Sequence, residues 1–196
     1  MSHKPLLLHA QHLSLAHGQQ PVIQDLNFSW PSGLSWICGD EGSGKTTLLR
    51  LLAGNLLPTA GTVQAPAGGV FWAHLQTPEY DELTVQACWD ALRPRYPQWQ
   101  DTLLQKLTDE LAMRPHVLKK LNMLSTGSRR KVMLIAALAS GAAVTLLDQP
   151  FVSLDTVSIQ LIKAFLSEAS QHPSRAWLVA DYEVPTDLPL ATVLQL

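Results

Sequence analysis

The chain has 196 residues, of which 46% are hydrophobic and 15% are charged, and its formal net charge at pH 7 is -2. This composition supports a sizeable core and excludes a disordered chain, and without a basic excess no nucleic-acid partner is expected. The two cysteines, Cys38 and Cys88, are too few for a disulfide framework and favour a reducing cytosol.

The first third of the chain reads as strands followed by one helix. Residues 6–18 and 21–30 are two predicted strands joined by a Gly-Gln-Gln-Pro turn, and residues 34–38 are a short apolar strand. A glycine-rich stretch follows, and then a helical pattern that Gly54 is expected to end. Another strand is predicted at residues 68–76. The helical pattern buries four leucines: Leu48, Leu49, Leu51 and Leu52.

The middle of the chain, residues 84–122, has a helical period that the sequence RPRYP interrupts, so it is predicted to be a helical insert. After residue 129 helices and strands alternate, which indicates a mainly parallel sheet with helices on both faces. These expected elements are a helix after residue 129, a strand at 144–148, a helix near 156–170, a strand at 176–180 and a last strand at 191–196.

The most apolar stretch, residues 132–147, falls short of the ~20 residues that span a bilayer, so no transmembrane helix is expected. The start, MSHKPLLLHAQH, is too short and too polar for a signal peptide.

Residues 39–46 fit the pattern G-x-x-x-x-G-K-[ST]. Glycines let consecutive backbone N–H groups converge on phosphate oxygens, Lys45 reaches the β and γ phosphates, and the Thr46 hydroxyl ligates Mg2+. A simple glycine-rich turn is the alternative, but this motif follows a predicted strand and opens a predicted helix. The candidate nucleotide contacts in this loop are Gly39, Asp40, Glu41, Gly42, Ser43, Gly44, Lys45, Thr46 and Thr47. The side chains of Asp40 and Glu41 are expected to point to solvent.

Other motifs follow in a fixed order. Gln76 stands after a strand, L-S-T-G occupies 124–127, a strand ends in Asp148, and S-L-D occupies 153–155. Ser125 is expected to cap the helix that follows it. This layout resembles the ATP-binding subunits of ABC transporters over nearly the full length. The short chain and the D-x-P-F form of residues 148–151 are most similar to the haem-exporter ATPases of cytochrome c maturation.

The resemblance implies an α/β fold: a P-loop NTPase (RecA-like) core with a mixed, mainly parallel sheet and a helical subdomain. Residues 1–80 and 129–196 would form the core, and residues 81–128 the subdomain. ATP and Mg2+ would be the cofactors. A second ATPase protomer, in a homodimer or heterodimer, and an integral membrane permease subunit would be the partners. The chain would lie on the cytoplasmic face of the inner or plasma membrane.

The resemblance also implies a role for each motif. Thr46, Gln76 and Asp148 would hold the metal, and Gln76 would also sense the γ-phosphate. Ser125 and Gly127 would donate to ATP held by the other protomer, and Asp155 would link the two sites. His17 would stack under the adenine.

Two residues depart from this family at the terminal phosphate. Gln149 stands in place of the catalytic glutamate, and Asp181 in place of the switch histidine. An amide orients water but does not take its proton, and an ionised aspartate does not donate to phosphate. The sequence therefore predicts weak hydrolysis. A laboratory substitution is a second origin for Gln149, and Asp181 favours a natural one.

Three functions are compared. The first is a transporter subunit that hydrolyses ATP slowly or with help from a partner chain. The second is an ATP-gated module whose output is dimerisation. The third, a small-molecule kinase, leaves L-S-T-G and S-L-D without a role and is disfavoured.

Overall fold

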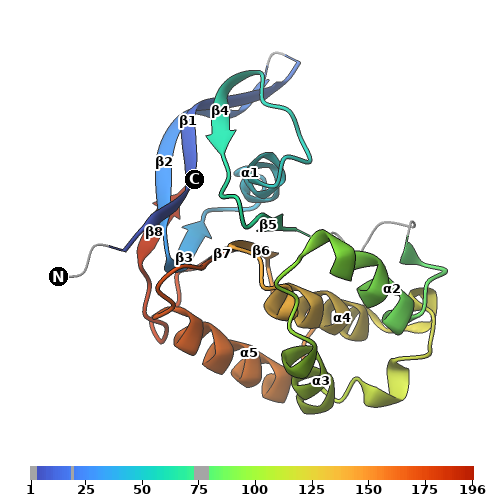
Figure 1. Ribbon diagram of the computed structural model, residues 1–196. Coiled ribbons are helices and arrows are strands. Elements are labelled where there is room, and N and C mark those ends of the chain that lie inside the picture. The colour runs from blue at the N-terminus through green and yellow to red at the C-terminus, as the bar shows by residue number, and fades with distance from the viewer. Residues whose placement is uncertain (1–3, 19, 73–79) are drawn as a thin grey trace. The chain divides into compact units, whose positions relative to one another are not determined.

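The computed structural model describes residues 4–18, 20–72 and 80–196 (Figure 1). The chain divides into two compact units. The first combines the described part of Met1–Trp72 with Ala143–Gln149 and Phe165–Leu196, and the second combines the described part of Ala73–Ala142 with Pro150–Ala164. The division into a nucleotide-binding core, residues 1–80 and 129–196, and a helical subdomain, residues 81–128, stays a prediction.

The first unit is built on a five-stranded parallel sheet with the order β5-β6-β7-β3-β8. Apolar residues run almost without interruption through its central strands, as expected for strands covered on both faces. All six residues of β3 are buried. The strands are β3 (Gly33–Cys38), β5 (Val70–Phe71), β6 (Val144–Asp148), β7 (Ala176–Asp181) and β8 (Thr192–Gln195). Of the predicted strand at 68–76, residues 73–76 lie outside the described residues.

A separate antiparallel sheet of three strands has the order β2-β1-β4. The predicted N-terminal hairpin is confirmed, because β1 (Leu6–His17) pairs with β2 (Gln20–Pro31). The third strand, β4 (Ala60–Gln64), is absent from the sequence prediction. Four of its five residues are exposed, so it lacks the apolar alternation that identifies a strand from sequence.

Helices cover both faces of the parallel sheet, as predicted. Helix α1 (Lys45–Leu52) buries the four predicted leucines in the main core, which also contains Leu178 of β7. Trp177, the neighbour of Leu178, points to the opposite face and meets Phe165 of α5 (Thr156–Ala169), with ring centroids 6.2 Å apart.

The second unit is helical, which confirms the predicted insert. The indole N–H of Trp89 in α2 donates to the carbonyl oxygen of Val132 in α4 at 3.0 Å, so a polar atom is satisfied inside an apolar core. The elements of this unit, besides the start of α5, are α2 (Val85–Leu92), η2 (Arg93–Arg95), α3 (Asp101–Glu110), η3 (Arg114–His116), η4 (Leu121–Met123) and α4 (Thr126–Ala139). The turn η2 lies where the sequence predicts a break.

Within the described part of the chain, none of the helices combines the length and the apolar character that crossing a membrane requires. Cys38 and Cys88 are both buried and free of disulfides. Burial raises the pKa of the Cys88 thiol to about 11, so this side chain stays a small neutral core residue.

The burial of α1 gives a testable prediction. Leu48→Ala should lower the free energy of unfolding by about 2–5 kcal/mol, because Leu48 is fully buried and its loss leaves a cavity. Leu57→Ala is the matched control, since the Leu57 side chain is 85% exposed, and its effect should stay within about 0.5 kcal/mol. Urea unfolding measures both. Equal effects would contradict the placement of α1 against the sheet.

Candidate functional site

The phosphate-loop pattern lies between β3 and α1 in the first unit. Gly42 and Gly44 have φ values of 78° and 98°, which L side chains rarely adopt. A Cβ on Gly39 would lie 2.8 Å from the backbone carbonyl oxygen of Leu196. The loop therefore needs glycine for its conformation at two positions and for space at a third.

Lys45 is the first residue of α1, and only 6% of it is exposed. Its ammonium donates to the carbonyl oxygens of Gly39 and Asp40, each at 2.7 Å. The same nitrogen lies 4.8 Å from the centroid of the Tyr182 ring, within the range of a cation–π interaction. The lysine is thus held over the loop, where a phosphate would replace the carbonyl oxygens as its partner.

Thr46 and Asp148 are brought together from positions 102 residues apart. The Thr46 hydroxyl donates to a carboxylate oxygen of Asp148 at 2.6 Å. Asp148 ends β6, and parallel strands bring their carboxyl ends to one edge of the sheet. A hydroxyl and a carboxylate are oxygen donors of the kind that Mg2+ prefers, so these two residues fit the predicted metal.

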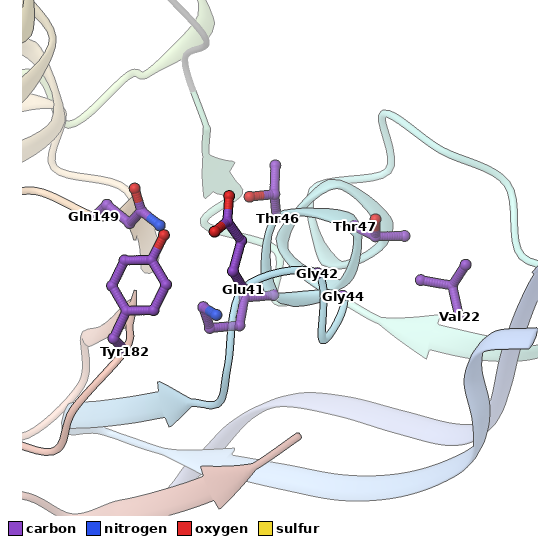
Figure 2. Close-up of a pocket in the computed structure, with 9 residues that line it drawn as sticks. Val22, Glu41, Gly42, Gly44, Thr46, Thr47, Gln149 and Tyr182 are labelled. Carbon is purple, nitrogen blue, oxygen red and sulfur yellow. The ribbon is translucent and has the colours of Figure 1, made fainter.

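A pocket of about 360 Å³ adjoins the loop (Figure 2). It is lined by Val22, Glu41, Gly42, Gly44, Lys45, Thr46, Thr47, Gln149 and Tyr182. The backbone N–H of Gln149 donates to the carbonyl oxygen of Ala180 at 2.8 Å, which attaches the end of β6 to β7. Gln149 has a φ of 44°, a value uncommon for residues with a side chain.

Asp181 ends β7 and pairs in register with Cys38, the last residue of β3. This pairing places it beside the start of the phosphate loop, and its role at the terminal phosphate stays a prediction. One of its carboxylate oxygens accepts from the backbone N–H of the following residue, Tyr182, at 2.8 Å. The carboxylate therefore makes a local turn contact, and it is the Tyr182 side chain that lines the pocket.

Of the two acidic residues in the loop, only Glu41 lines the pocket. Asp40 and Glu41 are both exposed, in line with the sequence expectation. Glu41 nevertheless lines the pocket (Figure 2), so its carboxylate adds negative charge where phosphate is expected. Like charges at short range repel, so Glu41 weakens the attraction of this site for a polyphosphate.

Two pocket residues were not identified from the sequence, Val22 and Tyr182. Val22 lies on β2, and its side chain comes within 3.1 Å of where a Cβ on Gly44 would stand. Tyr182 directly follows a strand at the sheet edge that carries the phosphate loop, and this position is the signal by which it could have been found.

Two predicted contacts have no described side chain. His17 ends β1, where its backbone pairs with Gln20, and its role under an adenine stays a prediction. Gln76 lies outside the described residues.

The L-S-T-G motif forms the start of α4 in the second unit. The Ser125 hydroxyl accepts from the backbone N–H of Ser128 at 3.2 Å, which confirms the predicted helix cap. A Cβ on Gly127 would lie 2.4 Å from the carbonyl oxygen of Ser153. The glycine of this motif is therefore required by the close approach of the segment that carries S-L-D.

Asp155 caps α5 in the same unit. It accepts from the backbone N–H of Ser158 at 2.9 Å, and the ammonium of Lys131 donates to it at 2.7 Å. The Lys131 ammonium, together with the hydrogen bonds from Ser158, holds the pKa of the Asp155 carboxyl well below its usual range. The roles of Ser125, Gly127 and Asp155 across a dimer stay predictions.

The fold and the loop geometry define a nucleotide-binding protein of the phosphate-loop class. Residues 23–152 match the family model described as ABC transporter, so the chain belongs to this family as one of its ATP-binding subunits.

The relatives agree with this assignment. The chain is 28% identical to ABC transporter I family member 1 of Arabidopsis thaliana, over 95% of this chain and 86% of that protein. It is 30% identical to the cytochrome c biogenesis ATP-binding export protein CcmA of Nitrosococcus oceani, over 82% of this chain and 79% of that protein. A solved dimeric structure of a bacterial ABC transporter cassette has the same fold, with a TM-score of 0.74, 18% identity and coverage of 90% and 88%.

The contact at Gly127 gives a second prediction. A glycine-to-alanine change inside a helix normally stabilises it by about 0.5–1 kcal/mol. Here Gly127→Ala should instead lower the free energy of unfolding by about 1–3 kcal/mol, because the new methyl group collides with a backbone carbonyl. Thr126→Ala, at the exposed neighbouring position, is the control and should stay within about 0.5 kcal/mol. Urea unfolding measures both, and stabilisation by Gly127→Ala would refute the close approach.

Proposed function

We propose that this subunit binds Mg2+–ATP at the phosphate loop and transmits dimer closure to a membrane permease, with slow hydrolysis by its own residues. The observation that carries the proposal is the 2.6 Å contact between Thr46 and Asp148 beside the buried Lys45. These groups would serve the metal and the phosphates together.

The chemistry of binding follows from the loop. Backbone N–H groups and the N-terminus of α1 provide partial positive charge, and the Lys45 ammonium adds a full one. Thr46 and Asp148 would hold Mg2+, which would neutralise phosphate charge when bound. The charge of Glu41 opposes these attractions, so binding rests on the loop backbone and Lys45.

Hydrolysis needs a base and a donor near the terminal phosphate. Gln149 lines the pocket and would orient the attacking water, but its amide does not accept the proton at neutral pH. The neutral amide also adds no negative charge beside the γ-phosphate, which favours a long-lived ATP-bound state. The proposed cycle is therefore limited by chemistry rather than by binding.

A second protomer would complete the site. Ser125 and Gly127 would donate to ATP held by the partner, and Asp155 would connect the two sites. The solved bacterial cassette of the same fold is described as dimeric, which supports this arrangement. The permease would contact the segment around residues 77–83, with the subunit on the cytoplasmic face of the membrane.

A second function uses the same site without turnover. With Gln149 and Asp181 both altered, ATP binding and dimerisation could themselves be the output, as in a regulatory module. The lining of the pocket by Gln149 favours this alternative as well, because an amide there leaves binding intact.

The amide gives a prediction for turnover. Gln149→Glu should raise the ATP hydrolysis rate of the purified chain by about 10²-fold, because a carboxylate can take the proton of the attacking water. Gln149→Met, which can neither orient nor deprotonate water, is the control and should not exceed the wild type. Phosphate release measures turnover, and light scattering follows ATP-dependent dimerisation.

Each outcome separates the two functions. A slow wild type with a faster Gln149→Glu supports a disabled base in a working site. Equal inactivity with ATP-dependent dimers favours the regulatory module. Brisk turnover by the wild type would refute the proposed weakness of hydrolysis.

The contact between Thr46 and Asp148 gives another prediction. Asp148→Asn should weaken Mg2+ binding about 10–100-fold, because the carboxylate charge is lost while a hydrogen-bond acceptor for Thr46 remains. ATP affinity should fall in the presence of Mg2+ and equal that of the wild type when EDTA removes the metal. Asp25→Asn, a change at an exposed carboxylate of β2, is the control. Loss of ATP affinity in EDTA as well would contradict a metal role for Asp148.

A further inference from the structure

Tyr182 lies at the point of the sheet where the phosphate loop begins. Asp181 pairs with Cys38 in the parallel register of β7 and β3. The residues that follow these two strands are Tyr182 after β7 and Gly39, the first residue of the loop, after β3. The sheet therefore delivers the Tyr182 side chain to the site, independently of any contact that the side chain makes.

Hydrogen bonds fix the backbone on both sides of Tyr182. Before it, the Asp181 carboxylate accepts from the Tyr182 N–H at 2.8 Å. After it, the indole N–H of Trp36 donates to the carbonyl oxygen of Glu183 at 2.8 Å. Trp36 is a β3 residue and only 2% exposed, so this second bond ties the segment to the core. The position from which the Tyr182 side chain projects is thus set by the fold.

The ring of Tyr182 points into the pocket. The Lys45 ammonium lies 4.8 Å from the centroid of this ring. Tyr182 nevertheless stays 46% exposed. Its hydroxyl is directed toward the side chain of Gln149 (Figure 2). The hydroxyl therefore faces the part of the pocket between the lysine that reaches the terminal phosphates and the residue at the base position.

We propose that the Tyr182 hydroxyl donates a hydrogen bond to the terminal phosphate of bound ATP. This inference rests on the proposed function of the site. Asp181 holds the position of the usual donor, but a carboxylate only accepts hydrogen bonds, and one of its oxygens already accepts from the Tyr182 N–H. The phenol of Tyr182 can donate a hydrogen bond and carries no charge that would repel phosphate. It belongs to the next residue in the sequence, which lines the pocket.

A donor to the terminal phosphate distinguishes ATP from ADP, because ADP lacks that group. Hydrogen bonds to charged partners are among the stronger ones in proteins. Tyr182→Phe keeps the ring against Lys45 and removes only the hydroxyl. It should reduce affinity for a non-hydrolysable ATP analogue about tenfold, and leave ADP affinity unchanged within about twofold.

The experiment is isothermal titration calorimetry with Mg2+, the analogue with an imido bridge between the β and γ phosphates, and ADP. Tyr96→Phe, at a buried tyrosine of the second unit, is the matched control and should change neither affinity. A second background carries Asp181→His, which restores a donor beside Tyr182. In that background Tyr182→Phe should reduce affinity for the ATP analogue only about twofold, because two donors share one phosphate.

The outcomes separate this inference from the function beneath it. If wild-type protein binds neither nucleotide, both fail. If it binds both and Tyr182→Phe leaves both affinities unchanged, the donor role is refuted and the proposed function stands. If Tyr182→Phe weakens ADP as much as the ATP analogue, the hydroxyl contacts a part of the nucleotide that ADP also has, and the donor role at the terminal phosphate is refuted. ADP binding by each variant also shows that it is folded.

Discussion

The register of three parallel strands is the constraint on which the site depends. Cys38 of β3 pairs with Asp181 of β7, and Asp148 of β6 pairs with Ala180 of β7. These pairings bring the phosphate loop, the end of β6 and the segment after β7 to one edge. A slip of one residue in any of the three strands would turn its side chains to the opposite face. Both faces of these strands are buried, so a slip would exchange side chains of different size, such as Leu178 and Trp177, between two close-packed layers. Core packing therefore holds the register on which the site depends.

Groups of opposite charge lie at this edge of the sheet. Lys45, the loop N–H groups and the α1 N-terminus attract phosphate, while Glu41 in the pocket repels it. Gln149 contributes no charge where a carboxylate would add repulsion. Under the proposed function, the amide at position 149 would therefore offset part of the effect of Glu41. Affinity and turnover would then depend on different residues.

Most of the fold could be predicted because its signals are local. Apolar runs identify the central strands, the glycine-lysine-threonine pattern fixes the loop, and Ser125 predicts the start of α4. β4 could not be predicted, since its exposed and small residues pair only because β1 offers an edge. The loop pattern predicts Thr46 as a metal ligand, the resemblance adds Asp148, and the structure joins the two residues. Tyr182 required the register of β7 against β3, which no single stretch of sequence contains.

The close approach of Gly127 to Ser153 has a mechanical consequence. The two backbones leave no room for even one methyl group, and the ion pair of Lys131 with Asp155 adds a second connection between the same segments. The first turn of α4 and the segment leading into α5 therefore restrain one another within the second unit. A displacement of either segment should be transmitted to the other. Substitutions at residues 127, 131, 153 and 155 should accordingly be non-additive, because these residues share neighbours.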